Sequence, residues 1–399
     1  MPTSPHSLAT AATLDRHADT RTAALAAAEA IGESLQGAAD AVLIFGSFHH
    51  AAALPVAVET VRQILHPKAA IGITASGVIG GAVELESGPG LSVLGIRHAG
   101  ARIRTFNFDY GDGPPEVWTR NLVRSRLRPM SPPRGMLVFA DPFTAGSDIL
   151  PHRLAQAVPP ATPIIGGLLS GGSQPRANVL IADDNVSVSG AVGLMFEGDI
   201  ELEPLLSHGC RPVGPPMVAT AAEGNNLQQI GGKPAVSAIQ EIARQLPEDD
   251  RMLMAKGPLI GIVTNPTKPR FGRSDFVIRN VAAANERKGN LLLNGPIRPG
   301  STIQIQVRDA DTAREDLAMA LDLAVMNPVP PEASIVMTCT GRGKSLFGES
   351  GHDAKEIQRR LDAPPQIGFM ATAEIAPVNG IPRLHGLGVV GALLRTPAN

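Results

Sequence analysis

The sequence has few of the residues that would mark several common classes of protein. It contains only 2 cysteines in 399 residues, Cys210 and Cys339, and they lie far apart. This excludes a disulfide framework and gives no metal-ligand spacing, so we expect a reducing compartment, the cytoplasm. Aromatic residues make up only 3% of the chain. The interior must therefore be built mainly from Ala, Val, Leu and Ile.

Charge of one sign is also lacking, since the formal net charge is −2. No run of Lys or Arg forms the basic stripe that a phosphate backbone requires, so we expect no nucleic-acid partner. No apolar run approaches the roughly 20 residues that span a bilayer, and the first 40 residues lack a basic start followed by an apolar core. We therefore expect neither a membrane partner nor secretion.

Glycine and proline are abundant, with 42 and 35 residues respectively. They indicate a chain with many turns, as in proteins built on sheets with many connections. A chain of 399 residues is longer than a single hydrophobic core usually supports, which favours two domains. The first predicted element is an amphipathic helix over Thr20–Leu35.

A shift of 94 residues superposes two segments of the chain without a gap. Each segment reads as a buried strand, a helix (52–65 and 147–158), a second strand and a Gly-rich turn. Such a unit normally makes a right-handed crossover between parallel strands. The matching pairs are Leu43-Ile44-Phe45 with Leu137-Val138-Phe139, Ile71-Gly72 with Ile165-Gly166, and Ser76-Gly77 with Ser170-Gly171.

Further strands follow each unit, at 90–94 and 102–108 in the first and at 190–194 and 200–206 in the second. They alternate apolar and polar residues, which predicts antiparallel hairpins that extend the sheet. A weaker third copy closes the chain. It consists of Ile335-Val336-Met337, a helix over 353–361, Ile367-Gly368-Phe369 and a final strand over 386–394.

The region between the second and third copies differs in pattern. It opens with a Pro-rich stretch, 210–216, which reads as a domain boundary or a turn. We predict an α/β protein with mixed sheets covered by helices, in two domains at 12–208 (the two repeats) and 209–396. The elements expected in this region are helices at 235–246 and 312–325, the latter capped by Asp309 or Asp311, and strands at 259–263, 276–283 and 302–307.

The order of these segments resembles the FIST family, with its N-terminal and C-terminal FIST domains. The residues that carry the resemblance lie at 43–47, 72–80, 88–92 and 164–171 in the first domain. In the second they lie at 223–225, 230–235, 339–343, 368–369, 374–375 and 384–386. The resemblance implies a sensory module proposed to bind small ligands such as amino acids or their derivatives. Because no kinase, cyclase, chemoreceptor or F-box segment accompanies these domains, signalling would need a separate partner protein.

The first candidate site is the loop Cys339-Thr340-Gly341-Arg342-Gly343. It follows a buried strand, so its backbone amides can point outward, and Arg342 offers a planar fork for a carboxylate or phosphate. Glu374, near another strand end, could accept hydrogen bonds from a ligand, and we include His385 of the same domain. The alternative interpretation of the loop is a tight turn with a buried, inert thiol.

The second candidate site lies around Arg273, Asp275 and Arg279. A guanidinium and a carboxylate together suit a zwitterion such as an amino acid, although surface ion pairs look identical in a sequence. Asp141 is a further candidate acceptor near a strand end, or a helix cap. The equivalent residues Ser76 and Ser170 could hydrogen-bond a ligand or simply cap their turns.

Neither a cofactor nor a metal is expected. His49-His50 lack a third ligand at a readable spacing, and adjacent residues rarely point the same way. We predict a ligand-binding sensor that works by a shift between two arrangements of the protein. One alternative is an enzyme that uses Cys339 as a nucleophile, with His352 or His385 as the base. The other is a ligand-free scaffold for protein partners.

Overall fold

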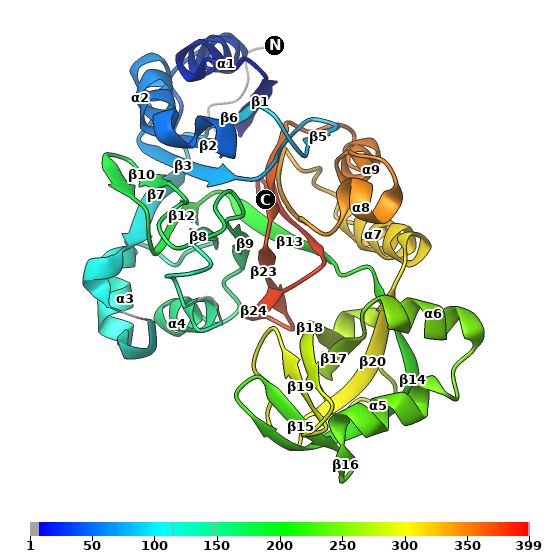
Figure 1. Cartoon of the computed structure of the whole chain (residues 1–399). Helices are drawn as coiled ribbons and strands as arrows, with labels where there is room; N and C mark the ends of the chain where they lie inside the picture. Colours follow the sequence, from blue (N-terminus) through cyan, green and yellow to red (C-terminus); the bar gives the residue numbers. More distant parts are fainter. Residues whose placement is uncertain (1–7, 114, 147, 398–399) are drawn as a thin grey trace. The chain divides into compact units, whose positions relative to one another are not determined.

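The computed structural model describes residues 8–397 except Pro114 and Ser147. The described strands form three six-stranded sheets and one seven-stranded sheet. Contacts divide the chain into two compact units (Figure 1). Unit 1 contains the described residues up to Leu206 together with Met319–Leu384 and those from Gly388 onward, and unit 2 contains Ser207–Ala318 and His385–Leu387.

Unit 1 is built on three strand-helix-strand repeats, which confirms the predicted α/β class and its repeated units. In each repeat the two strands are adjacent and parallel. The predicted start of the second helix, Ser147, lies outside the described residues. The repeats are β2(Ala41–Ser47), α2(Leu54–Leu65) and β3(Ala69–Ala75); β8(Gly135–Ala140), α4(Leu150–Ala157) and β9(Ile164–Leu168); and β21(Ala333–Cys339), α9(His352–Arg360) and β22(Gln366–Ala371).

An antiparallel strand lies beside the first strand of each repeat: β6(Leu91–Arg97), β12(Ala191–Gly198) or β25(Val389–Arg395). The predicted hairpins are wrong, because the next strand joins a different sheet. β7(Ala101–Phe108) pairs with β12, and β13(Glu201–Ser207) belongs to the sheet of β25. The reason is that β6 is an interior strand. Both of its edges are already occupied, by β2 and by β1(Ala9–Asp15).

Short antiparallel strands also pass from each repeat to another (Figure 1). Each pair follows the second strand of its own repeat but extends the sheet of a different repeat. The three sheets are therefore interlocked, and no repeat completes its sheet alone. The pairs are β4(Val78–Gly80) and β5(Val83–Leu85) on β22, β10(Leu180–Ala182) and β11(Asn185–Ser187) on β3, and β23(Ala373–Val378) and β24(Ile381–His385) on β9.

The largest core cluster of unit 1 draws residues from all three sheets. At its centre Phe45 lies 5.3 Å, between ring centroids, from both Phe139 and Phe369. Gly167 makes room for this cluster, since a Cβ there would lie 3.2 Å from the Phe369 ring. The predicted helix α1(Thr20–Leu35) has the expected bounds and begins at the capping residue Asp19. Three aromatic rings thus hold the three sheets together.

Unit 2 contains the seven-stranded sheet. The predicted turn at 210–216 is wrong, because these residues begin β14. The strand accommodates them by a register shift between Val213 and Met217, with Gly214 at φ +66°. In sheet order the strands are β14(Cys210–Glu223), β20(Thr302–Arg308), β17(Leu259–Val263), β18(Phe276–Asn285), β19(Asn290–Leu293), β15(Asn226–Ile230) and β16(Lys233–Pro234).

The helices of this part of the chain are α5(Ala235–Ala243), α6(Glu248–Lys256) and α7(Ala310–Val325), the last of which continues into unit 1. Asp309 is the cap of α7, since its Oδ1 accepts a hydrogen bond from the Thr312 amide at 2.7 Å. This settles the choice that the sequence left open between Asp309 and Asp311. None of the helices in the described part of the chain is long and apolar enough to cross a membrane.

Candidate functional site

The loops that follow the first strands of the three repeats begin in the same way. The amides of Ser47, Asp141 and Cys339 donate to the carbonyls of Gly90, Gly190 and Gly388 at 2.8, 2.9 and 3.0 Å. These bonds fix the start of each loop at the carboxyl end of its strand. The three loops then differ in their side chains, so the chemistry of each repeat lies in the residues that follow.

The residue three positions after Ser47, Asp141 or Cys339 makes a different contact in each loop. In the first repeat the His50 Nδ1 lies 2.9 Å from the hydroxyl of Thr20, and burial lowers the pKa of His50. In the second, Thr144 accepts a hydrogen bond from the Gly190 amide at 2.9 Å. In the third the residue is Arg342, whose side chain is fully buried. Only the third repeat therefore places a permanent charge inside the protein at this position.

Arg342 is held by a two-pronged ion pair with Asp353. Its Nε lies 2.6 Å from Oδ2 and its Nη2 lies 2.9 Å from Oδ1, and both side chains are 0% exposed. The guanidinium also lies 5.3 Å from the centre of the Phe347 ring. Burial alone would raise the pKa of Asp353, but the charge and hydrogen bonds of Arg342 outweigh it and hold that pKa well below its usual range.

Glu84 joins this ion pair from another repeat. It lies on β5, and its carboxylate accepts the amides of Gly351 at 3.2 Å and Ala354 at 2.8 Å. Burial, followed by the neighbouring charge of Asp353, raises the pKa of Glu84 to about 7. A single buried guanidinium therefore lies near two carboxylates, and one of these titrates near neutral pH.

Glu374 and Cys339 belong to the same buried network. The Glu374 Oε2 accepts the Gly388 amide at 3.2 Å, and its side chain is buried. Burial alone would lower the pKa of Arg342. The interactions of Arg342 with Asp353, Cys339 and Glu374 outweigh burial and raise that pKa. The structure thus brings three of the predicted residues together. We call Arg342, Asp353, Glu84, Glu374 and Cys339 the Arg342 network.

The two predicted glycines belong to the same loop. Gly341 is half-buried, and Gly343 is buried at the start of α8(Gly343–Phe347). Gly343 adopts φ +55°, and a Cβ there would lie 2.5 Å from a carboxylate oxygen of Glu86. That oxygen accepts the Lys344 amide at 2.9 Å. Glycine is needed at 343 both for its backbone conformation and for the approach of Glu86.

Ser76 and Ser170 lie next to each other, as their equivalent positions in the repeat suggest. Their hydroxyl oxygens are 3.0 Å apart, and the Ser170 oxygen accepts the Ser76 amide at 3.0 Å. Ser170 donates in turn to the Met370 carbonyl. The pair thus joins all three repeats, and a structural role accounts for these hydrogen bonds.

The second predicted cluster lies in unit 2. Arg273 pairs with Glu315 at 3.0 Å, and Asp275 accepts the Gly272 amide at 2.9 Å and pairs with Lys268. Burial alone would raise the pKa of Asp275, but the hydrogen bond from Lys268 keeps that pKa below its usual value. Arg279 is buried, with Gly295 packed against its guanidinium. Ligand binding by Arg273, Asp275 and Arg279 stays a prediction.

His385 also lies in unit 2 and contacts a residue that the sequence did not single out. Its Nδ1 is 2.8 Å from the Nε2 of His208, and both rings are buried. One ring must carry the proton between these two nitrogens. Across the described residues, no group of three or more His, Cys, Asp or Glu side chains is arranged to hold a metal ion.

Sequence reasoning also missed Glu84 and Asp353. The sequence offered only a weak indication of a site at Asp353. An acidic residue in the first turn of a helix is usually explained by its favourable interaction with the helix dipole. Glu84 offered no indication, since the amide of Ala354 that it accepts is 270 residues away in the chain. Only the exchange of strands between repeats brings the two residues together.

The fold is a three-repeat α/β unit carrying a second, strand-rich unit, and its candidate site is a buried charge network at strand ends. The model of the FIST N domain matches residues 40–233, and that of the FIST C domain matches residues 238–377. The chain therefore belongs to the FIST family, whose domains are generally associated with sensing and signal transduction.

Two mycobacterial proteins are similar to this chain over nearly their whole length. The uncharacterized protein Rv0628c of Mycobacterium tuberculosis (strain ATCC 25618 / H37Rv) is 33% identical over 380 residues, which cover 94% of this chain and 96% of that protein. The uncharacterized protein Mb0898c of Mycobacterium bovis (strain ATCC BAA-935 / AF2122/97) is 32% identical over 378 residues, with the same coverage of each chain. The similarity thus extends across both units.

Proposed function

We propose that this protein senses a small molecule by binding it at the Arg342 network of unit 1. The observation that supports this proposal is a guanidinium with 0% exposure within electrostatic reach of Asp353, Glu374 and Cys339. Burying charges is costly, and apolar packing could fill the same volume without that cost. Clusters of buried ionisable groups with shifted pKa values are typical of functional sites.

The chemistry of the network suits an amino acid or a related small metabolite. The guanidinium of Arg342 matches a carboxylate, and the carboxylates of Glu374 and Glu84 match an ammonium group. Arg342 is already bound to Asp353. A ligand carboxylate therefore has to exchange with Asp353, which requires the segment 341–354 to open.

Opening of this segment supplies the two arrangements that a sensor needs. Glu84 and Glu86 accept amides of this segment from the first repeat, so its movement would change the contacts of β5 as well. We propose that a separate signalling partner protein detects this change. Neither cysteine forms a disulfide, and both are buried, which supports the further proposal that the protein works in the cytoplasm.

Thermal-shift measurements with a panel of amino acids, small organic acids and amines would test the proposal. A ligand present at about 100 times its Kd should stabilise the protein by about 2.7 kcal/mol. We expect at least one amino acid to raise the melting temperature of the wild type but not of Glu374→Gln. The exposed helix position Glu33 provides a matched control, Glu33→Gln, which should respond like the wild type.

No response across the panel would contradict ligand sensing. An equal response of Glu374→Gln and the wild type would contradict the proposed site while leaving ligand binding intact. The two failures are therefore distinguishable.

The alternative of an enzyme depends on a reactive Cys339. Cys339 is 5% exposed, and a buried cysteine is usually inert. We expect a thiol-directed reagent to label Cys339 slowly at neutral pH, at a rate close to that of the buried Cys210. Rapid labelling of Cys339 alone would instead favour nucleophilic catalysis.

A further inference from the structure

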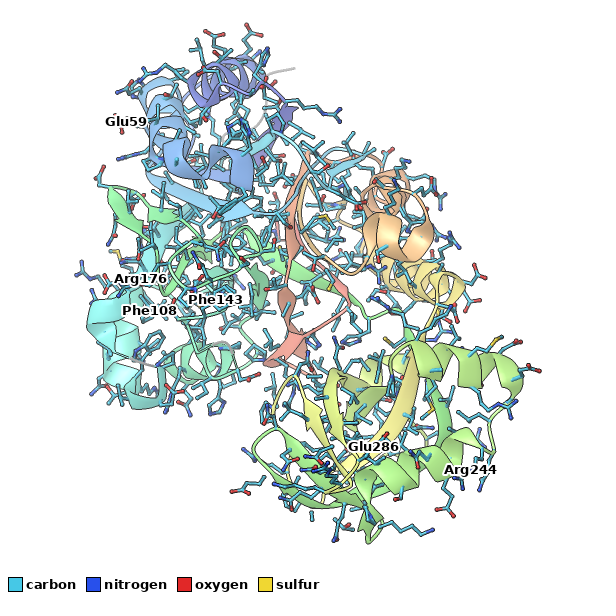
Figure 2. The ribbon with its side chains drawn as sticks, in the orientation of Figure 1. Glu59, Phe108, Phe143, Arg176, Arg244 and Glu286 are labelled. Atoms are coloured by element: carbon cyan, nitrogen blue, oxygen red, sulfur yellow. The ribbon has the colours of Figure 1, made fainter. Side chains whose placement is uncertain are left out.

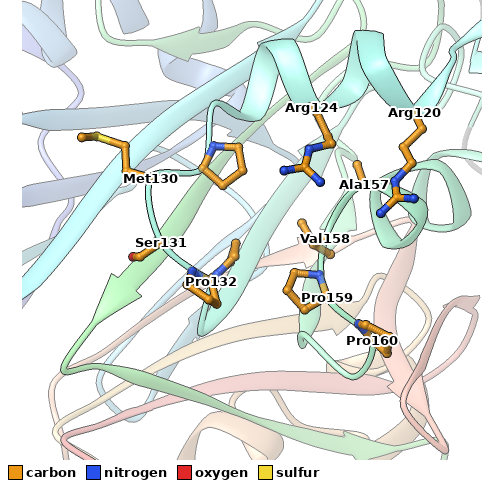
Figure 3. Close-up of a pocket in the computed structure, with 11 residues that line it drawn as sticks. Arg120, Arg124, Met130, Ser131, Pro132, Ala157, Val158, Pro159 and Pro160 are labelled. Carbon is orange, nitrogen blue, oxygen red and sulfur yellow. The ribbon is translucent and has the colours of Figure 1, made fainter.

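A groove at the amino ends of β8 and β9 contains two arginines that no group among the described residues neutralises. The groove consists of two adjoining cavities. One has a volume of about 380 Å³ and is lined by Arg120, Arg124 and proline side chains, and the other has a volume of about 520 Å³. The cavities share Pro133, Pro159 and Pro160. Figure 3 shows both guanidiniums extending from the helix toward the loop that carries Val158 and Pro159.

The helix that carries these arginines is firmly seated. α3(Arg120–Leu127) begins at Thr119, whose hydroxyl accepts the Leu122 amide at 3.2 Å. Its inner face, Val123 and Leu127, is buried in a core cluster that also contains Trp118 and Phe108. Figure 2 labels Phe108 beside this helix. The helix therefore presents Arg120 and Arg124 from a fixed base, and both lie on the side exposed to solvent.

The arginines that neighbour Arg120 and Arg124 make ion pairs or hydrogen bonds. Arg126 pairs with Asp112, and Arg153 donates to backbone carbonyls of the segment before α3. Among the residues that the structure describes, the guanidiniums of Arg120 and Arg124 make no ion pair and no hydrogen bond. Two like charges four residues apart on a helix repel each other. A bound anion would remove this repulsion.

The walls of the groove indicate the size and polarity of the rest of the ligand. Prolines on both sides, together with Val158 and Met130, give a rigid apolar lining, and Ser131 adds one hydroxyl. A cavity of about 380 Å³ lies in the size range of small-molecule sites. The neighbouring cavity adds Arg134 and Glu201, so the groove continues toward mixed polar groups.

We propose that this groove binds a small organic phosphate with an apolar body. A phosphate monoester is a dianion at neutral pH, which balances two guanidiniums, and its terminal oxygens match their planar forks. Its apolar part would lie against the proline walls. This site goes beyond the proposed sensing function, since its residues precede β8 and β9 whereas the segment 341–354 follows β21.

Calorimetric titration with phenyl phosphate tests this inference, with inorganic phosphate and benzoate as comparison ligands. We expect phenyl phosphate to bind more tightly than either, because only it combines the double charge with the apolar ring. Loss of a charge-assisted hydrogen bond should weaken binding about tenfold in Arg124→Gln, and more in the double variant with Arg120→Gln.

Arg21→Gln is the matched control, since it removes the same charge from the exposed first turn of another helix, α1. It should bind phenyl phosphate like the wild type. An unchanged melting temperature would show that the Arg120 and Arg124 variants are folded. Absence of phenyl phosphate binding to the wild type, or equal binding by the wild type and the double variant, would overturn the inference.

Discussion

Arg342 in unit 1 and Arg273 in unit 2 are each paired with a carboxylate, but their surroundings differ. The side chains of Arg342 and Asp353 are both 0% exposed, whereas those of Arg273 and Glu315 are 27% and 65% exposed. Water screens the second pair, and exposed pairs contribute little to stability. The first pair is shielded from water, so each partner depends on the other. Burial, rather than residue type, separates the two predicted arginine clusters.

The two clusters also differ in which parts of the protein would respond to a change within them. The Arg342–Asp353 pair lies against Glu84, which belongs to the chain segment of another repeat, so a change in the pair reaches a second repeat. The partners of Arg273 and Asp275 lie within unit 2 and partly in water. On these grounds we favour the Arg342 network as the sensing site.

Breaking the buried pair should have the largest effect. Arg342→Met leaves Asp353 buried without its cation, which should lower the free energy of unfolding by about 3–5 kcal/mol. Urea denaturation monitored by circular dichroism measures the loss. The double variant Arg342→Met, Asp353→Leu should recover most of it, because it removes both charges. A loss below about 1 kcal/mol in the single variant would show that the pair behaves like a surface pair.

The pH dependence of stability should show a smaller effect, due to Glu84. Its pKa rises from an ordinary value of 4.5 to about 7 on folding, so the folded state binds more protons than the unfolded state between these values. Stability from this group is therefore present below pH 4.5 and lost as the pH rises to about 7, by about 3 kcal/mol.

Glu84→Gln should remove this contribution. In urea denaturation at several pH values, the wild type should become less stable relative to the variant as the pH rises from 5 to 8. The depressed pKa of Asp353 acts in the opposite sense and only in acid, because its contribution is lost as the pH falls below its unfolded value of 3.8. A difference between wild type and variant that does not change with pH would contradict the assignment to Glu84.

The smallest effect is expected in unit 2. Arg273→Gln should lower the free energy of unfolding by no more than about 1 kcal/mol, because the Glu315 partner is exposed. The same urea experiment measures it, and added salt should make this loss smaller still, because salt screens an exposed ion pair. A loss as large as that of Arg342→Met would remove the distinction between the two clusters.

Much of the fold could be predicted from local pattern. The strand-helix-strand repeats, the third copy, the bounds of α1 and the α/β class follow from apolar runs and helical spacing, which are local properties. Local pattern could not predict which sheet β7 joins, or that residues 210–216 form part of a strand. Both depend on which sheet edges are already occupied, and that is a property of the assembled sheets.

The candidate site shows the same limit. The sequence pointed to Cys339, Arg342 and Glu374 because each lies near the end of a strand, and the structure places them in one network. It did not point to Glu84, whose partners are separated from it by 267 and 270 residues. It also could not distinguish Arg342 from Arg273, because the burial of a charged side chain depends on the packing around it.

Hydrogen exchange with and without ligand tests the central claim most directly. With the amino acid that gives the largest thermal shift, we predict slower amide exchange in peptides covering both 341–354 and 84–86, and no change at 273–279. Protection at 273–279 with none in the first two segments would contradict the account and would place the ligand in unit 2.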